Sequence, residues 1–221
     1  RHIINRKING TVPLTIDKEA IRSLYIPVFS KQFMMAIAHI IDKSELILSR
    51  SKQVYKNSEE LIYKALHLDT WEPATETKSI KSYSDCFINC NRLDAEYYQP
   101  KYDELFALLG AYDTKTLSEI VNIEKSIEPG SEAYQTDGIP FIRVANLSKF
   151  GISDTDVYLS AEEYGDTIRP KKDTILLSKD GSVGIAYKVE EDADIITSSA
   201  ILHLTVKDDS VIPDYLTLVL N

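Results

Sequence analysis

The sequence predicts an α+β protein in which a strand-rich domain is attached to one long helix, and this helix is expected to form an antiparallel coiled coil. Two observations lead to this prediction. Residues 31–68 contain neither glycine nor proline, and their side chains follow a heptad rhythm. The C-terminal half contains short runs of β-branched and aromatic residues, separated by turn sequences such as EPGS, TDG and KDGS.

The long helix carries a stripe in which small and aliphatic side chains alternate. The small residues Ser44, Ser51, Ser58 and Ala65 recur every seventh position, and Ile40, Ile47, Val54 and Leu61 recur at the same interval. Small residues on a seam let a second helix approach closely, and aliphatic ridges then close over it. A helix over residues 31–68 extends roughly 55 Å at 1.5 Å per residue, so we expect a second helix beside it. The alternative is a long core helix within one globule.

Short elements are expected after this helix. Strands are predicted at about 121–127, 139–144, 174–178, 184–189 and 195–206, with a further strand candidate at 86–88. Pro100 and Pro213 are suited to the first turn of a helix, and Ser160 is suited to capping one.

The chain is acidic overall, with a formal net charge of −9, but its charge is uneven. Residues 1–70 carry 11 Lys and Arg against 7 Asp and Glu, whereas residues 71–221 carry 14 against 27. This balance argues against a non-specific nucleic-acid binder, which normally presents a basic face. A DNA-binding surface here must concentrate its few cations in one place or borrow them from a partner.

Several other classes of protein are disfavoured. No apolar run of 18 residues is present, so no membrane span is expected. Cys86 and Cys90 form neither a disulfide framework nor a zinc pattern, which is typical of a reducing cytosol. We find no catalytic motif and no cofactor fingerprint, so no enzyme is predicted. Because the chain begins with Arg1 rather than methionine, we interpret it as a piece of a longer protein.

Two stretches contain candidate DNA-binding residues. In LLSKDGSVGIAY, residues 176–187, Lys179, Asp180 and Ser182 project from a turn between two strands, and such a loop can meet a phosphate or a base edge. The alternative is an ordinary hairpin with polar residues at its tip.

In GIPFIRVANL, residues 138–147, Arg143 and Asn146 interrupt an apolar strand, and these two residue types suit bidentate contacts to guanine and adenine. The alternative is an arginine paired with a local carboxylate. Lys125, Tyr134 and Lys149 lie near these strands in the sequence and can contact the DNA backbone; equally, they can be solvated surface residues.

The order of these segments resembles the specificity subunit of type I restriction–modification systems. The resemblance is carried by GTVPLTIDKEAIRSLYIPV, Gln32 at the head of the long helix, RLDAEYYQPKYDEL, GIPFIRVANL, LLSKDGSVGIAY and PDYLTLVLN. It implies two target-recognition domains, separated by two long antiparallel helices that act as a spacer. Each domain would recognise half of a split DNA site, and the helices would dock the methyltransferase subunits.

On this resemblance, residues 1–30 are the closing segment of a preceding target-recognition domain and residues 31–68 are the spacer helix. Residues 69–91 are a linker, and residues 92–221 are a target-recognition domain that is incomplete at its C-terminal end. The arrangement is close to a circular permutation. An antiparallel, helix-mediated homodimer would bring the closing segment of each chain to the recognition domain of the other.

The resemblance therefore implies a cytoplasmic, non-catalytic subunit that directs methyltransferase (M) and restriction (R) subunits to a bipartite site on double-stranded DNA. No cofactor is implied, because S-adenosylmethionine would belong to the methyltransferase. The expected DNA-binding residues are Arg143, Asn146, Lys179, Asp180, Ser182, Lys125, Tyr134 and Lys149. Two alternatives stay open: the specificity portion of a fused restriction–methyltransferase enzyme, and a protein-binding coiled-coil scaffold module.

Overall fold

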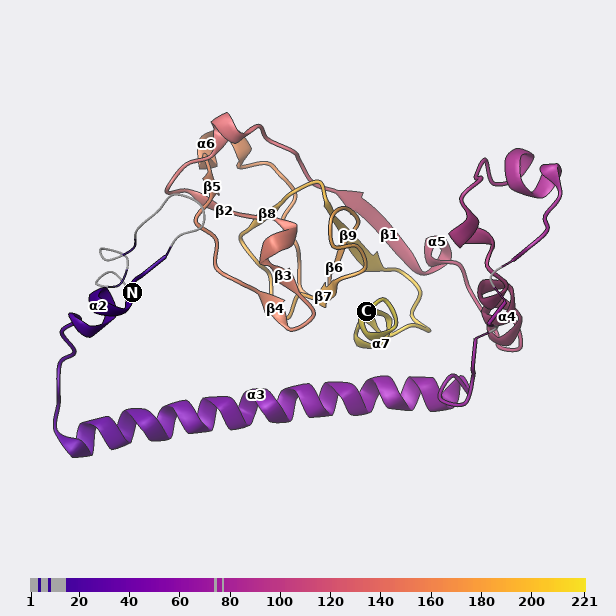
Figure 1. The fold of residues 1–221 in the computed structure, drawn as a ribbon. Helices are drawn as coiled ribbons and strands as arrows, with labels where there is room; N and C mark the ends of the chain where they lie inside the picture. The colour runs from indigo at the N-terminus through magenta and orange to yellow at the C-terminus, as the bar shows by residue number, and fades with distance from the viewer. Residues whose placement is uncertain (1–3, 5–7, 9–14, 74, 77) are drawn as a thin grey trace. The chain divides into compact units, whose positions relative to one another are not determined.

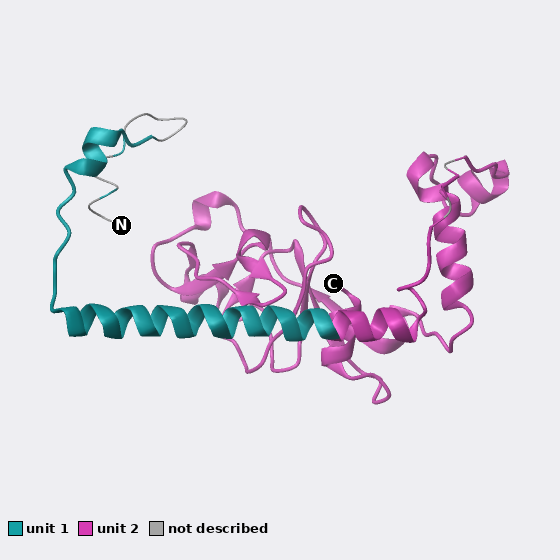
Figure 2. Cartoon of the chain, turned by 60° about the horizontal axis from the view of Figure 1, so that its bottom comes forward, with its two compact units in different colours: residues 1–57 teal, residues 58–221 magenta. Residues whose placement is uncertain are grey.

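The computed structural model describes residues 4, 8, 15–73, 75–76 and 78–221. It divides the chain into two compact units, residues 1–57 and residues 58–221 (Figure 2). The first unit contains the short helix α2 (Lys18–Arg22) and most of the long helix α3. The side chain of Asp17 begins α2 by accepting a hydrogen bond from the backbone N–H of Ala20 at 2.7 Å.

Helix α3 (Lys31–Ala65) is one uninterrupted helix of 35 residues (Figure 1). The predicted long helix is thereby confirmed, although it ends three residues early. His67 has a φ of 55°, a left-handed conformation that a right-handed helix cannot continue through. No residue of α3 is buried, and its heptad-spaced aliphatic residues are 56–69% exposed, namely Ile40, Ile47, Val54 and Leu61. The pairing of α3 with a second helix stays a prediction.

The second unit is built on a four-stranded antiparallel sheet in the order β1–β9–β6–β7. A second sheet has the order β5–β2–β8, with β8 parallel to β2, and β3 and β4 form a separate hairpin. The strands are β1 (Val121–Lys125), β2 (Ile139–Ile142), β3 (Leu147–Ser148), β4 (Gly151–Ile152), β5 (Tyr158–Leu159), β6 (Ile175–Ser178), β7 (Ala186–Lys188), β8 (Ile196–Thr197) and β9 (Ile201–Val206).

Short helices connect and cover these strands. They are the π-helical turn η1 (Ser84–Ile88), the 3-10 turns η2 (Ala95–Tyr98), η3 (Ser131–Ala133) and η4 (Val144–Asn146), and the α-helices α4 (Pro100–Leu109), α5 (Leu117–Ile120), α6 (Ala161–Tyr164) and α7 (Pro213–Val219). The sequence signals for their starts are confirmed: proline opens α4 and α7, and the Ser160 side chain caps α6 by accepting from the backbone N–H of Glu163.

The core lies on both faces of the four-stranded sheet, because successive strand residues point to opposite sides. Ile175 packs on one face with Leu216 of α7. Leu176, the next residue, packs on the other face with Ile142 and Ile201. A third cluster fills the smaller sheet and contains Ile139, Phe141, Leu159 and Ile196. Helix α7 and the β2–β3 region therefore cover opposite faces of the central sheet.

One expected strand is wrong, and two others were predicted with the wrong extent. Residues 86–88 lie in η1, where the Ser82 hydroxyl accepts a hydrogen bond from the backbone N–H of Asp85 and favours a helical turn. The strand expected at 139–144 ends at Ile142, because the Asn146 side chain accepts from the backbone N–H of Arg143 and closes η4. The strand expected at 195–206 is two strands, because β8 pairs with one sheet and β9 with the other.

Candidate nucleic-acid interface

The β6–β7 hairpin has the form that the sequence predicts, with a glycine-containing turn between paired strands. Its turn is fixed by Ser178, whose hydroxyl accepts from the backbone N–H of Ile185 at 2.9 Å and donates to the carbonyl of Ser182 at 2.5 Å. Lys179 and Asp180 follow Ser178 and form an ion pair with each other. The tip is therefore a shaped loop that holds one cation and one carboxylate next to each other.

The connection between β8 and β9, residues 198–200, contacts three neighbouring strand ends. The backbone N–H of Ser198 donates to the carbonyl of Ile142 at the end of β2, at 2.8 Å. Ser198 also forms a bridge with Ile127, just after β1. The backbone N–H of Lys179, just after β6, donates to the carbonyl of Ala200 at 2.9 Å. One short segment thus joins the ends of β1, β2 and β6.

These contacts gather residues from four parts of the chain at one end of the four-stranded sheet. We call this end the rim; it consists of Lys125–Glu128, Arg143, Lys179–Ser182 and Ser198–Ala200. The strand register agrees with this grouping, since Lys125 of β1 and Leu177 of β6 both lie opposite Leu202 of β9. Five of the eight expected DNA-binding residues lie in the rim: Lys125, Arg143, Lys179, Asp180 and Ser182.

Arg143 has hydrogen-bonding capacity that the protein leaves unused. Its Nε atom is buried and has no hydrogen-bond partner among the residues that the structure describes. Its Nη2 atom lies 3.7 Å from a carboxylate oxygen of Asp156, whose side chain is 94% exposed. Among the described residues, the alternative expectation of a local carboxylate partner is met by this one long, solvated contact, which contributes little. Oγ of Ser126, in the same rim, is also buried without a hydrogen-bond partner in the described part of the chain.

The rim also contains Glu128, an acidic residue that binds the β8–β9 connection and that the sequence analysis did not single out. Glu128 accepts hydrogen bonds from the backbone N–H and the hydroxyl of Ser199, at 3.2 and 2.7 Å. This pair joins residues 71 positions apart, so no local pattern reveals it. The run Thr197–Ala200, small and polar between two apolar strands, is the one signal that could have marked the crossover.

Three expected residues have other surroundings. Asn146 uses its amide within its own loop, accepting from the backbone N–H of Arg143 and donating to the carbonyl of Asp154 at 3.1 Å. The Tyr134 ring packs 5.7 Å from that of Phe141, in the third core cluster. Lys149 pairs with Glu59 on the last turns of α3, at 2.9 Å.

A buried histidine lies directly behind the crossover. His203 is 2% exposed, and its Nε2 atom lies 2.8 Å from the hydroxyl of Thr197. Burial lowers the pKa of His203 to about 4, because a charged imidazolium loses its hydration there. At neutral pH this histidine is therefore an uncharged structural partner of the crossover.

The described residues contain no helix of the length and apolar character that a bilayer span requires. Among the same residues, no three His, Cys, Asp or Glu side chains are grouped so as to hold a metal ion.

Comparison with known proteins identifies the family. Residues 110–221, which include the whole rim, match the type I restriction modification DNA specificity domain. This match covers just over half of the chain, and the chain therefore belongs to that family. No curated protein matches it.

The chain also matches solved structures, at low identity and with TM-scores below 0.5. An HsdS subunit from Thermoanaerobacter tengcongensis has 14% identity and a TM-score of 0.38, with 99% of this chain and 49% of that chain covered. A type I restriction–modification S subunit from M. genitalium has 16% identity and a TM-score of 0.37, with the same coverage.

A chain from a structure of type I R-M complex assembly and conformational transition has 13% identity and a TM-score of 0.42, with 90% and 46% covered. The present chain spans about half the length of the solved chains that it matches.

Proposed function

We propose that this chain recognises DNA sequence as part of a type I specificity subunit, directing methyltransferase and restriction subunits to a bipartite site. The observation that carries this proposal is the grouping of cationic side chains in the rim. In a chain of net charge −9, it brings three cations from three separate strand ends to one edge of the family-matched region. One of them, Arg143, has a buried donor for which the described residues supply no acceptor.

The residues of the rim suit different parts of a DNA duplex. Arg143 can donate two hydrogen bonds to the O6 and N7 atoms of guanine, a contact that specifies a base. Lys179 and Lys125 suit phosphates, which position a protein without specifying sequence. Asp180 can accept from the amino group of cytosine, and the Ser182 hydroxyl can donate to or accept from a base edge.

The other three expected residues have supporting roles in this proposal. Asn146 holds the turn that presents Arg143. Tyr134 packs under the second sheet, and Lys149, paired with Glu59, is the third backbone-contacting candidate. The chain contributes no chemistry of its own, and S-adenosylmethionine belongs to the methyltransferase.

We further propose the domain organisation implied by the family resemblance. Residues 1–30 close a preceding recognition domain, residues 31–68 are a spacer, residues 69–91 are a linker, and residues 92–221 are a second recognition domain. The exposed heptad stripe of α3 supports a partner helix, since an apolar stripe of this length is costly in water. In an antiparallel homodimer, two copies of α3 would supply each other's partner.

Co-expression with a type I methyltransferase subunit tests the proposed function. We expect the two proteins to copurify and the methylated adenines to fall within one bipartite sequence, which can be mapped across the host DNA. An Arg143→Ala variant should still copurify, because Arg143 lies in the rim and not on α3, but the methylation pattern should lose or relax one half of the site. Methylation that is identical with and without this chain would contradict the proposal.

A further inference from the structure

The second unit contains an apolar groove of about 240 Å³ between the end of α3, helix α4 and helix α7. Its apolar lining includes Ile62, Leu66, Leu105, Leu109, Leu218 and Val219. Glu59 also lines the groove, but its carboxylate is already paired with Lys149 at 2.9 Å. The groove therefore offers apolar surface rather than free charge, and it contains no residue of the rim.

Hydrogen bonds hold the walls of the groove in place. The hydroxyl of Tyr112, just after α4, donates to the backbone carbonyl of Ala65 at the end of α3, at 3.0 Å. At the end of α7, the side chain of Asn221 donates to the carbonyl of Ala186 in β7 at 2.9 Å and accepts from its N–H at 3.1 Å. The groove is therefore part of the folded second unit and not a gap between loosely attached helices.

The stripe of α3 indicates how two copies would pair. In an antiparallel pair, small side chains of one helix allow close approach where they face aliphatic side chains of the other. If Ser51 of one copy faces Ile47 of the second, counting outward along both helices gives the further pairs Ser44 with Val54, Ser58 with Ile40, Ala65 with Phe33 and Ile37 with Leu61. A shift by one heptad in either direction leaves one of these layers fewer.

A second apolar row flanks the stripe and leads to the groove. It consists of Met34, Ile41, Leu48, Tyr55 and Ile62, which are seven residues apart. In the same register, the two-fold axis brings Leu48 to Leu48 of the second copy and Met34 to Ile62 of the second copy. Met34 of one copy is then level with the turn between Ile62 and Leu66 of the other, and both of these residues line the groove.

We propose that the groove receives the Met34 side chain of a second copy of this chain. Met34 is 44% exposed, and a methionine side chain is flexible enough to fill an irregular apolar groove. The inference rests on the antiparallel homodimer of the proposed function, and it adds the contact that fixes the register of the two helices. That register matters, because a shift of one heptad would move the two recognition domains by roughly 10 Å along the helices.

Disulfide cross-linking tests the register. The variant Ile37→Cys/Leu61→Cys, with Cys86→Ser and Cys90→Ser, is treated with oxidised glutathione, which is reduced as two thiols form a disulfide. Residues 37 and 61 lie roughly 36 Å apart along one helix, so a disulfide between them must join two chains. We expect a covalent dimer on a non-reducing gel. The control Ile37→Cys/Val54→Cys, which is one heptad out of register, should give far less.

Sedimentation equilibrium of the full chain tests the role of Met34. Met34→Ala should raise the dissociation constant of the dimer at least about tenfold, because a two-fold dimer loses the contact twice. Met35→Ala is the matched control. Met35 is 62% exposed and belongs to neither apolar row, so its loss should leave the constant unchanged.

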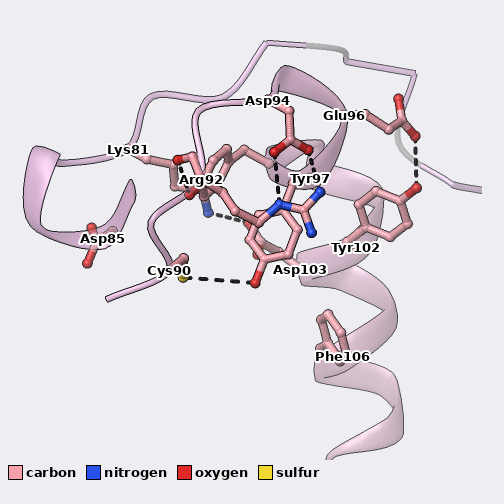
Figure 3. A pocket seen from close by; sticks show the side chains of 11 residues that line it. Lys81, Asp85, Cys90, Arg92, Asp94, Glu96, Tyr97, Tyr102, Asp103 and Phe106 are labelled. Carbon is pink, nitrogen blue, oxygen red and sulfur yellow. Dashed lines mark hydrogen bonds and ion pairs between the residues drawn. The ribbon is translucent and has the colours of Figure 1, made fainter. Parts of the chain in front are cut away.

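A second pair of variants tests the groove itself. Leu105→Ala, in the wall of the groove, should also weaken the dimer. Phe106→Ala should not, because Phe106 is the next residue of α4 but lines a different cavity (Figure 3). If Leu105 and Met34 act on the same contact, Leu105→Ala should have no further effect in the Met34→Ala chain.

The outcomes separate this inference from the proposals on which it rests. A monomeric unaltered chain would contradict the homodimer and with it the groove contact, while DNA recognition by a single chain would still be measurable. A dimer that cross-links equally through residues 37 and 54, that responds equally to Met34→Ala and Met35→Ala, or in which the effects of Leu105→Ala and Met34→Ala simply add would overturn the groove contact alone.

Discussion

Arg143 follows strand β2. Its buried nitrogen Nε has no hydrogen-bond partner within the described ranges of the chain, and its Nη2 atom lies 3.7 Å from a carboxylate oxygen of the exposed Asp156. Leaving a buried donor unpaired costs about 1–3 kcal/mol. A ligand that supplies the missing acceptor would remove this cost in the bound state. The position next to the Ser198–Ala200 crossover makes Arg143 the residue of the rim best placed to specify a base.

We predict that Arg143→Ala lowers the affinity for the preferred duplex by about 10- to 100-fold, the value of one good arginine–guanine contact. Fluorescence anisotropy with a labelled duplex measures this change. Lys171→Ala is the matched control, because Lys171 is a cation outside the rim whose side chain is 71% exposed. An equal loss in both variants would show that Arg143 acts only through net charge.

The lowered pKa of the buried His203 should make the stability of the fold depend on pH. Its pKa is about 4 in the folded chain and about 6.5 in the unfolded chain. Between these values only the unfolded chain binds the proton. The free energy of unfolding should therefore fall as the pH drops through this window, by about 3 kcal/mol in all.

Urea denaturation between pH 7 and pH 4 measures this effect, and His203→Gln should lack it. The comparison uses the change with pH in each protein, so a difference in absolute stability does not matter. The same loss of stability in both proteins would mean that other groups cause it.

Among the elements, those with local signals were predictable from the sequence. Pro100, Ser160 and Pro213 mark the starts of helices, and the absence of glycine and proline marks α3. The break at Ser198–Ala200 was missed, because its one local signal is the short run of small residues Thr197–Ala200, and the pairing of β8 and β9 with different sheets depends on residues far away in the sequence.

Contacts between residues far apart in the sequence also limit what could be predicted about the site. Lys125, Arg143 and Lys179 were chosen for their chemistry, and strand pairing brings them together. Tyr134 looked like a surface residue, but the sequence does not show that its ring meets Phe141. Glu128 was missed, because its partner Ser199 lies 71 residues away.

Two glycines allow a prediction at the level of elements. Gly138 precedes β2 with a φ of 117°, and a Cβ atom there would lie 2.3 Å from the carbonyl oxygen of Leu159 in β5. Gly181 in the β6–β7 turn has a φ of 71°, and a Cβ atom there would meet no atom of the described residues within 4 Å. Alanine is therefore strained at both positions but clashes only at Gly138.

We expect Gly181→Ala to cost about 1–2 kcal/mol of stability, the cost of left-handed backbone in a non-glycine residue. Gly138→Ala should cost clearly more, because β2 and β5 must also separate. Chemical denaturation of the two variants measures both values. Equal costs would contradict the close approach of β5 to Gly138.

At the scale of the whole molecule, the exposed stripe of α3 leads us to predict that the chain forms a homodimer. An exposed heptad stripe needs a partner helix, and a second copy of this chain offers the same stripe. Light scattering at micromolar concentration should give about twice the chain mass of 25.0 kDa. Ile47→Asp should give a monomer without unfolding, because Ile47 is 59% exposed. A monomeric unaltered chain would remove the homodimer from the proposal.

The most direct test of DNA-sequence recognition is selection from a random pool of DNA duplexes by the purified chain. We predict enrichment of one short sequence, present as two inverted half-sites at a fixed spacing if the chain dimerises. Affinity for it should fall with salt, with a slope of about −2 per chain, because Lys125 and Lys179 are the two rim cations proposed to contact phosphates. Enrichment of a single half-site would contradict the proposed homodimer but would still support recognition of DNA sequence. A pool that stays random would contradict the proposed function.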